Sequence, residues 1–292
     1  MPALDAASPS GPETSLPALR REIDAIDDAL HDLVMRRADV VARMAASRVK
    51  GDSSSFKPGR EASILRRLLA RHSGPLPAGA LARLWRELLS ASNAMQGAFS
   101  VALPEGDAEV YKAARSRFGA MAAPDLRAGP EAALAALAEG AAQAAVLPVP
   151  AEEGAGAWWT GLDAPRLQVV VRLPFYAVAP VPQAVVVTRD GPDPSGDDRS
   201  LLRLAFAADA DADAAAARGA VSAALRDAGL RESAPPLLTR QHGGVWALAE
   251  VDGAVPEGDP RLSALRARLP ANRVQPLGFY ATPIRAAPDG GE

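Results

Sequence analysis

The first part of the chain carries a long helical pattern of apolar positions. From Leu16 to Met44, apolar residues return at alternating steps of three and four, which is the spacing of one face of an α-helix. They occupy positions 16, 19, 23, 26, 30, 33, 40 and 44. The pattern predicts a helix over about residues 15–50, which at 1.5 Å per residue would be ~54 Å long. An apolar face of that length needs other helices, or a second copy of the chain, to cover it.

Arg37 interrupts this apolar face at the position where the next apolar residue after Leu33 would fall. Because a buried arginine is costly unless an opposite charge meets it, we expect the face to line a pocket that takes an anion. Arg48 lies only about 20° from the same face and ~16 Å along it, so Arg37 and Arg48 could hold the two ends of one small dianion. Arg20 lies ~25 Å before Arg37, on a face rotated by about 100°. We therefore expect Arg20 to serve a site in another subunit.

Two shorter helical patterns follow a Gly/Ser-rich break at residues 51–55, and they predict helices over about 59–72 and 78–98. Each has polar residues where packing alone would favour an aliphatic one. Glu61, with Arg60 beside it, opens the apolar stripe of the first of these helices. Ser92 and Gln96, four residues apart, fall on the stripe of the second.

Each of these polar residues also has an ordinary structural explanation. A single arginine such as Arg20, Arg48 or Arg60 is most often a solvated surface charge, and a glutamine such as Gln96 is usually exposed. Ser92 alone could simply let two helices pack closely. Taken together, however, a set of cations with one acid and one amide favours a pocket for a dianion over a series of independent accidents.

The pattern changes after the helices. Short apolar runs then alternate with alanine-rich helical stretches, which is typical of an α/β segment. The runs lie at 100–103, 144–149, 167–173 and 184–188, and the helices at about 107–118 and 130–140. Residues 189–198 contain Gly, Pro and Ser among several charges, as in a linker.

The last part of the chain predicts the order βαββαβ, which is the ferredoxin-like arrangement. The strands are expected at 201–207, 233–239, 244–251 and 274–281, and the helices at 211–228 and 260–269. We thus predict a multidomain protein, with an all-α three-helix unit followed by a short α/β segment and a ferredoxin-like α+β unit. The expected bounds are 1–14 for a disordered tail, 15–98 for the helices, 99–190 for the α/β segment and 198–285 for the last unit.

Composition narrows the classes of function. The net charge is −3 with both signs interspersed, which does not suggest binding to nucleic acid or to a membrane surface. There is no cysteine, so thiol catalysis and zinc–thiolate sites are excluded, and the three histidines lack the spacing of metal ligands. No apolar run approaches the ~20 residues of a membrane span, and residues 1–14 do not form a secretory signal. We expect a cytoplasmic protein without a metal.

No nucleophile–base pair accompanies the polar set, because cysteine is absent and no serine elbow or nearby histidine is present. A pocket that offers only cations and hydrogen-bond donors still accelerates a reaction if it holds a reactive conformer and stabilises developing charge.

The helical part resembles the all-helical (AroQ-type) chorismate mutase family in four short motifs. They are residues 19–27 (LRREIDAID), 35–37 (MRR), 58–61 (PGRE) and 92–96 (SNAMQ). The resemblance covers about residues 15–98. It implies an intertwined helical dimer, and an isomerase that rearranges chorismate to prephenate in a pericyclic Claisen step without a cofactor.

The resemblance also implies roles for the polar residues. Arg37 and Arg60 would hold the substrate carboxylates, Arg20 would reach in from the partner subunit, and Ser92 would line the carboxylate end. Glu61 would accept a hydrogen bond from the ring hydroxyl group.

The catalytic pair implied by the resemblance would act on the ether oxygen, which gains negative charge as its bond to carbon breaks. Gln96 would hydrogen-bond this oxygen. The second donor is usually a lysine in the family, whereas the matching position here is Arg48, which keeps the charge and changes its shape. Lys57 is a second departure, because the family often has an acidic residue there.

The rest of the chain resembles a degenerate form of the bifunctional chorismate mutase–prephenate dehydratase proteins. Residues 101–106 (VALPEG) and the following Tyr111 and Phe118 are similar to the start of a prephenate dehydratase lobe. Residues 99–190 are about half as long as the family's two-lobed domain. The family's Thr-Arg-Phe motif is absent, since Thr188-Arg189-Asp190 does not match it.

The C-terminal unit resembles an ACT regulatory domain. Residues 231–235 (RESAP) are similar to the phenylalanine-binding Glu-Ser-Arg-Pro motif without its arginine, and 277–280 (LGFY) are similar to the closing strand. Residues 219–221 (GAV) are a partial match to the companion Gly-Ala-Leu motif. The resemblance implies an aromatic amino acid, phenylalanine, as effector.

Three functions remain open from the sequence. The first is a chorismate mutase with a shortened dehydratase-like segment, and the second is a still bifunctional enzyme. The third is a non-catalytic regulator of another shikimate-pathway enzyme that has kept the mutase fold. Against the third stands the polar set, which a scaffold would have no packing reason to keep.

Overall fold

The computed structural model describes residues 15–47, 56–97, 99–119, 122–177, 183–207, 214–241, 244–269 and 271–285. The chain forms two compact units, Met1–Asp52 and Ser53–Glu292. The expected tail at 1–14 and the candidate residue Arg48 lie outside the described residues.

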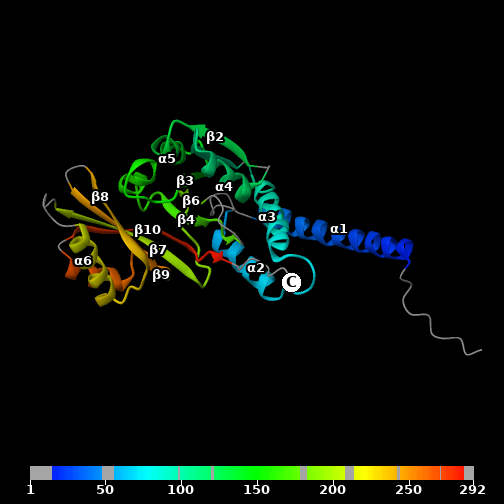
Figure 1. Ribbon diagram of the computed structural model, residues 1–292. Helices are drawn as coiled ribbons and strands as arrows, with labels where there is room; N and C mark the ends of the chain where they lie inside the picture. Colours follow the sequence, from blue (N-terminus) through cyan, green and yellow to red (C-terminus); the bar gives the residue numbers. More distant parts are fainter. Residues whose placement is uncertain are drawn as a thin grey trace, which may run out of the picture. The chain divides into compact units, whose positions relative to one another are not determined.

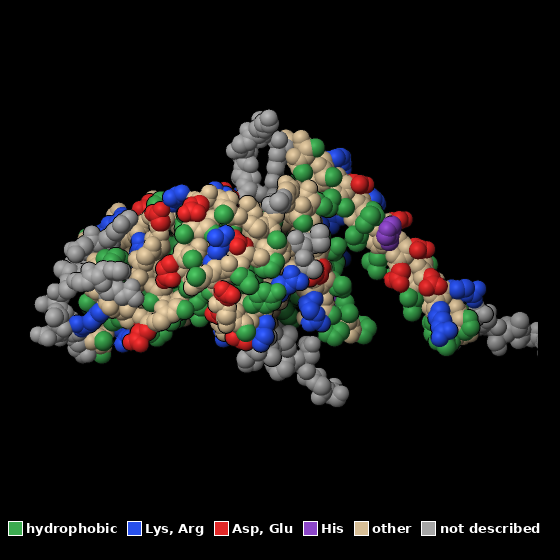
Figure 2. Space-filling view, turned by 90° about the horizontal axis from the view of Figure 1, so that it is seen from above, with side chains coloured by type: hydrophobic (Ala, Val, Ile, Leu, Met, Phe, Trp, Pro, Cys, Tyr) green, Lys and Arg blue, Asp and Glu red, His purple; other side chains and the backbone are tan. Residues whose placement is uncertain are grey.

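Helix α1, Leu16–Ser47, is the described part of the first unit, and it confirms the long helix predicted from the apolar pattern. None of its residues is buried. Its apolar face is open to solvent, as in Leu30, which is 54% exposed, and Leu33, which is 57% exposed. Figure 2 shows hydrophobic side chains at the surface of this helix between charged ones. The face has the apolar character of a packing surface.

Helices α2, Pro58–Ala70, and α3, Ala78–Ala94, belong to the second unit. Pro58 stands in the first turn of α2, where its missing N–H costs no hydrogen bond. Ala62 and Leu65 of α2 are buried in a small core with Phe175, against which Trp85 of α3 packs. The predicted helices are confirmed, although α3 ends about one turn earlier than expected.

Within the described residues, nine strands form one sheet in the order β2-β1-β3-β6-β4-β10-β7-β9-β8 (Figure 1). Their bounds are β1 Ser100–Pro104, β2 Ala123–Arg127, β3 Ala144–Pro148, β4 Gln168–Leu173, β6 Ala184–Thr188, β7 Asp198–Ala207, β8 Glu232–Gln241, β9 Gly244–Asp252 and β10 Ala271–Ala281. A separate parallel pair joins β5, Tyr176–Ala177, to β11, Ile284–Arg285.

Alternate residues of the first strands face different helices. Val101 and Leu103 of β1 share a core with α4, Ala108–Phe118. Ala102, between them, belongs to the core of α5, Pro130–Glu139, and of the 3₁₀ helix η1, Gly154–Gly161. The period of two in a strand thus places α4 on one face of the sheet and α5 and η1 on the other.

The C-terminal part confirms the predicted βαββαβ order, as β7, α6, β8, β9, α7 and β10. Helices α6, Ala214–Asp227, and α7, Pro260–Arg268, contribute Val221, Leu225 and Leu262 to one core with the strands. The fold class expected from the sequence, helices followed by mixed α/β structure, is confirmed.

The α/β part and the ferredoxin-like part share the same sheet, although a linker separates them in the sequence. Strand β10 pairs in parallel with β4 at Gly278 and Val169. Gly278 has a φ of +123°, and a Cβ atom there would lie 2.2 Å from the Val169 carbonyl oxygen. Glycine is therefore required for this close approach of the two strands.

A buried arginine also connects the two parts. Arg203 of β7 donates hydrogen bonds to the carbonyl oxygens of Trp159, Thr160 and Leu162, at 3.0, 2.7 and 3.0 Å. It also donates to the side-chain oxygen of Gln275 at 2.6 Å. These bonds fix η1 and the turn after it against the centre of the sheet.

Strand β2 and helix η1 were not expected from the sequence. Strand β2 (APDLR) contains a proline and an aspartate, which are rare in strands, and it is tolerated because it lies at the sheet edge. Helix η1 (GAGAWWTG) has no helical period in its apolar residues. Trp158 and Trp159 anchor it by donating hydrogen bonds to the carbonyl oxygens of Pro148 and Ala151.

Candidate active site

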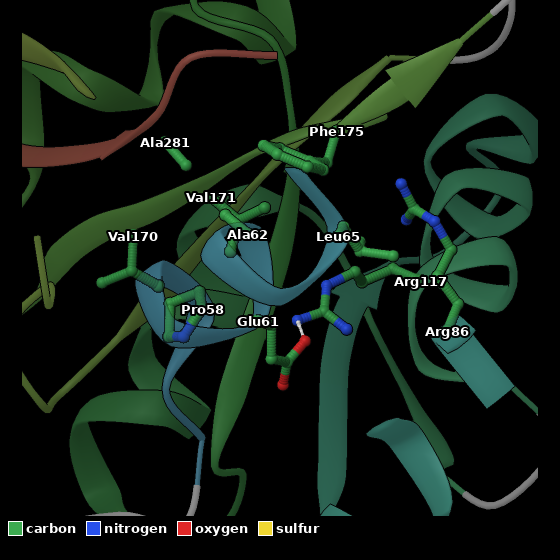
Figure 3. A pocket seen from close by; sticks show the side chains of 10 residues that line it. All are labelled: Pro58, Glu61, Ala62, Leu65, Arg86, Arg117, Val170, Val171, Phe175 and Ala281. Carbon is green, nitrogen blue, oxygen red and sulfur yellow. Dashed lines mark hydrogen bonds and ion pairs between the residues drawn. The ribbon is translucent and has the colours of Figure 1, made fainter. Parts of the chain in front are cut away.

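Glu61 is the best-defined candidate residue in the second unit. It lies in the first turn of α2 and is 8% exposed. Arg117 of α4 donates to its Oε2 atom at 2.5 Å, and Asn93 of α3 donates to its Oε1 atom at 3.0 Å. Figure 3 shows the Arg117 guanidinium pointing at the Glu61 carboxylate. Both carboxylate oxygens are thus held by donors from two other helices.

Arg117 is fixed by aromatic rings as well as by its ion pair. Its guanidinium carbon lies 5.0 Å from the ring centre of Phe56 and 5.2 Å from that of Phe118. Phe99 completes this aromatic cluster, at 5.6 Å from Phe56. Stacking on these rings favours the charged guanidinium in a buried position.

Arg86 of α3 brings a second buried guanidinium to the same place. Burial, and to a smaller extent the like charge of Arg117, lowers the pKa of Arg86 to about 10, while the Glu61 carboxylate opposes the change. Arg86 therefore remains protonated at neutral pH.

A cavity of about 30 Å³ lies between these charges and the sheet (Figure 3). Its lining is mostly apolar, with Glu61, Arg86 and Arg117 as the charged members. The other residues are Pro58, Ala62, Leu65, Val170, Val171, Phe175 and Ala281. Pockets for small organic molecules usually measure roughly 300–1,000 Å³, so this cavity is too small for a substrate such as chorismate.

The candidates at the end of α3 are bonded within their own helix. Ser92 is buried, and its Oγ atom donates to the Leu88 carbonyl oxygen at 2.6 Å. Gln96 donates from Nε2 to the Ser92 carbonyl oxygen at 2.9 Å. Its Oε1 atom is buried and has no hydrogen-bond partner among the described residues. That acceptor therefore has unused bonding capacity.

The start of α2 is capped from the linker. Asp193 accepts hydrogen bonds from the backbone N–H groups of Gly59, at 3.0 Å, and Arg60, at 2.9 Å. A Cβ atom at Gly59 would lie 2.1 Å from the Asp193 carbonyl oxygen, so the approach requires glycine. The carboxylate satisfies N–H groups that have no partner within the helix and complements the helix dipole.

The linker also binds α2 through Arg66, which donates to the Ser195 hydroxyl oxygen at 2.8 Å and to the Asp197 carbonyl oxygen at 2.7 Å. A further bond from Arg66 reaches the Thr282 carbonyl oxygen, just after β10, at 3.1 Å. Helix α2 is therefore held at both the linker and the end of strand β10.

The structure brings together only part of the predicted set. Glu61 is joined to α3 through Asn93, the neighbour of Ser92 in the sequence. The Arg60 side chain is exposed. Arg20 and Arg37 lie on α1 in the first unit, the former exposed and the latter partly exposed.

Sequence reasoning missed Arg86, Arg117 and Asp193. The first two stand on helices where a single arginine looks like a surface charge, and Asp193 lies in a Gly/Pro-rich linker. Arg117 meets Glu61 across 56 positions and Asp193 meets Gly59 across 134, so no local pattern signals either contact.

Within the described ranges, no three or more His, Asp or Glu residues gather in a way that could hold a metal ion. None of the described helices combines the length and apolar character that crossing a membrane requires.

Comparison with known proteins gives a family for the helical part. Residues 19–97 match the family Chorismate mutase type II. A bifunctional chorismate mutase/prephenate dehydratase of Stutzerimonas stutzeri is 37% identical over 98 residues, which cover 31% of this chain and 27% of that protein. Its counterpart in Pseudomonas aeruginosa is 35% identical over 101 residues, covering 32% and 28%. The matched segment thus spans little more than a quarter of these relatives.

The chain also has remote likenesses among solved structures. A prephenate dehydratase from Arthrobacter aurescens, solved in complex with L-Phe, has a TM-score of 0.45 and 14% identity, covering 65% of this chain and 93% of that one. A similarity this weak does not identify a function for the chain. The helical part of the chain, residues 19–97, matches the chorismate mutase type II family, which confirms the resemblance expected from its four motifs.

Proposed function

We propose that the chain is a chorismate mutase, an isomerase of aromatic amino acid biosynthesis that converts chorismate to prephenate. The observation that carries this proposal is the family match over residues 19–97, which contains all of the candidate site residues. The reaction is intramolecular: the ether C–O bond breaks while a C–C bond forms, and no cofactor is needed.

In the proposed mechanism, cations hold the two substrate carboxylates so that the reacting carbon atoms meet. Arg37 and Arg60 would bind the carboxylates, with Ser92 at the same end and Arg20 supplied by a second subunit. Holding the reactive conformer removes much of the entropic part of the barrier.

The second part of the mechanism concerns charge on the ether oxygen. Gln96 and Arg48 would stabilise this charge, and Glu61 would accept a hydrogen bond from the ring hydroxyl group. Each Glu61 oxygen accepts one hydrogen bond from a neighbouring helix and has lone-pair capacity for another. Because the cavity beside Glu61 is only about 30 Å³, substrate binding requires this region to open or α1 of a second copy to complete a larger site.

A homodimer is part of the proposal. The apolar face of α1 is exposed along its whole length, and a second copy of the same helix offers a face of matching length and character. A dimer would also provide the Arg20 of the other subunit.

The ferredoxin-like part is proposed to bind an aromatic amino acid effector. In the RESAP motif, Ser233 donates to Asp252 Oδ1 at 2.7 Å, and Arg231 pairs with the same carboxylate. If both the mutase rate and the thermal stability are indifferent to added phenylalanine, the effector part of the proposal is wrong. A cytoplasmic location is expected with this metabolic role.

A second activity, prephenate dehydratase, is suggested by the names of the two relatives. The missing Thr-Arg-Phe motif argues against it. An assay for phenylpyruvate formation from prephenate separates the bifunctional enzyme from a mutase alone.

The proposed function is tested by chorismate depletion with purified full-length protein. We expect turnover in the unaltered chain and a loss of roughly 100-fold or more in kcat for Arg48→Ala, because removing a transition-state donor costs ~3 kcal/mol. Arg43→Ala, an exposed arginine of α1, is the matched control and should keep the activity. Activity retained in Arg48→Ala removes Arg48 from the mechanism, and no depletion by the unaltered chain favours the non-catalytic regulator.

A further inference from the structure

Three buried charged side chains lie at α2 and the helices beside it, and their positive and negative charges are unequal in number. Arg86, Arg117 and Glu61 are 9%, 5% and 8% exposed. Arg117 and Glu61 form a close ion pair at 2.5 Å, which accounts for one charge of each sign. Arg86 adds a further positive charge, and within the described part of the chain Arg117 and Glu61 are the charges that act on it. The cluster therefore has an excess of one positive charge in a region of low dielectric constant.

One nitrogen of this surplus guanidinium has unused donor capacity. The Nη2 atom of Arg86 is buried and has no hydrogen-bond partner among the described residues. An arginine carries five N–H donors and cannot shed its charge at neutral pH, so a buried and unmet donor there is costly. The like charge of Arg117 adds to this cost.

Arg86 and Arg117 both line the cavity of about 30 Å³. A water molecule needs roughly 10–15 Å³ by the same kind of measure, so the space suits a ligand of one or two heavy atoms and excludes organic acids. Apart from Glu61 and the two arginines, its lining is apolar, with Leu65, Val171 and Phe175 among the lining residues. Such walls do not screen the charges.

We propose that Arg86 and Arg117 hold a small monovalent inorganic anion of the size of chloride in this cavity. A water molecule would satisfy the Arg86 donor but would leave the surplus positive charge uncompensated. An anion would accept a hydrogen bond from the Arg86 donor and would also compensate the surplus charge. It would further reduce the repulsion between the two guanidinium groups. Because the two arginines come from α3 and α4 and Glu61 from α2, bound anion would stabilise the packing of these three helices.

The proposal is tested by thermal unfolding of the full chain in chloride and in gluconate at equal ionic strength. Gluconate is too large for the cavity and controls for screening. At about 0.2 M salt, we expect the Tm to be higher in chloride by roughly 3 °C and to level off as the site fills. Equal Tm values in the two salts would overturn the proposal.

Two variants of α3 locate the effect. Arg86→Met removes the charge while keeping the length of the side chain, and we expect its Tm to be the same in both salts. Arg83→Met removes an exposed arginine of the same helix and should keep the full chloride effect. An undiminished chloride effect in Arg86→Met would contradict the assignment.

A second measurement uses the unaltered chain, so it does not depend on a variant that folds. Crystals grown in bromide should show an anomalous peak within hydrogen-bonding distance of both Arg86 and Arg117. Density at that point without anomalous signal means that water fills the cavity, and the proposal is then wrong. Neither measurement involves chorismate, so the anion site stands or falls independently of the mutase proposal.

Discussion

At the scale of single residues, the Glu61 carboxylate is held by donors from two helices that lie outside its own. Removing one partner of a buried ion pair leaves the other charge uncompensated, which costs more than the pair itself contributes. The Glu61–Arg117 contact is therefore a place where a single substitution has a large and specific effect on stability.

We predict that Arg117→Met lowers the free energy of unfolding by about 3–5 kcal/mol, because Glu61 would remain buried without its cation. Urea unfolding followed by circular dichroism measures the change. Arg115→Met, an exposed arginine of the same helix, is the control and should change stability by less than about 0.5 kcal/mol. Combining Arg117→Met with Glu61→Gln should recover part of the loss, and a loss that simply adds would contradict the pairing.

A second residue-scale prediction concerns acid stability. Asp259 caps α7, and its hydrogen bonds from the Arg261 side chain hold the pKa of this carboxyl below its usual value, although burial opposes the change. A depressed carboxyl pKa contributes stability above the unfolded-state value, near 3.8, which is lost as the pH falls through the lower folded-state value.

Asp259→Asn keeps a capping oxygen and removes the charge. We expect the unaltered chain to be more stable than this variant at pH 7, by about 1 kcal/mol, with the same difference down to about pH 5. The difference should shrink only below pH 4. Urea titrations at a series of pH values give this profile, and a difference that disappears between pH 7 and 5 would show that another group is responsible.

At the scale of elements, the N-terminus of α2 depends on a residue 134 positions away, Asp193. Gly59 permits this approach because any side chain would meet the Asp193 backbone. Within the PGRE motif, the glycine thus has a packing role, in addition to the binding role proposed for Arg60.

We predict that Gly59→Ala destabilises the chain by roughly 2 kcal/mol, through overpacking and loss of the cap. Gly219→Ala is the matched control, since Gly219 is also helical but a Cβ atom there meets nothing within 4 Å. That variant should be neutral or more stable by up to about 1 kcal/mol. Chemical unfolding of the unaltered chain and of the two variants measures these changes in stability. Equal stability of the two variants would rule out the close contact at Gly59.

Most elements of this fold could be predicted from the sequence, because their patterns are local. The helices at 58–70 and 108–118 and the strands at 184–188 and 244–252 follow from period and from Val-rich runs. The edge strand at 123–127 could not be predicted, since its pairing with β1, and not its residues, makes it a strand.

The relative positions of the candidate site residues could be predicted only for residues that lie on the same helix. The spacing of Arg20 and Arg37 along α1 could be derived from helical geometry alone. The partners of Glu61 could not, because Arg117 and Asn93 come from other helices, at separations set by the tertiary fold.

At the scale of the whole molecule, the exposed apolar face of α1 contrasts with the well-filled core of the nine-stranded sheet. Leu30 lies near the middle of this face and is 54% exposed. Exposed apolar surface of this kind is typical of interaction sites.

We predict that the unaltered chain is a dimer in sedimentation experiments and that Leu30→Glu makes it a monomer, because the charge would be buried in an apolar contact. Mutase activity should fall by roughly 100-fold or more in the same variant, since each site would lose the Arg20 of its partner. Asp28→Lys, on the opposite face of α1, is the control and should remain a dimer. A monomeric unaltered chain with full activity would refute the intertwined arrangement.

The position of β10 within the sheet has a consequence for how the protein is made. It is the last strand of the sheet in the sequence, yet it lies between β4 and β7 and joins the two halves. During translation, the strands up to β6 and the strands β7 to β9 are both synthesised before the strand that connects them. The emerging chain therefore presents the unpaired edges of β4 and β7 to the cell. We expect chaperones to be needed to protect these edges from aggregation until residues 271–281 have left the ribosome.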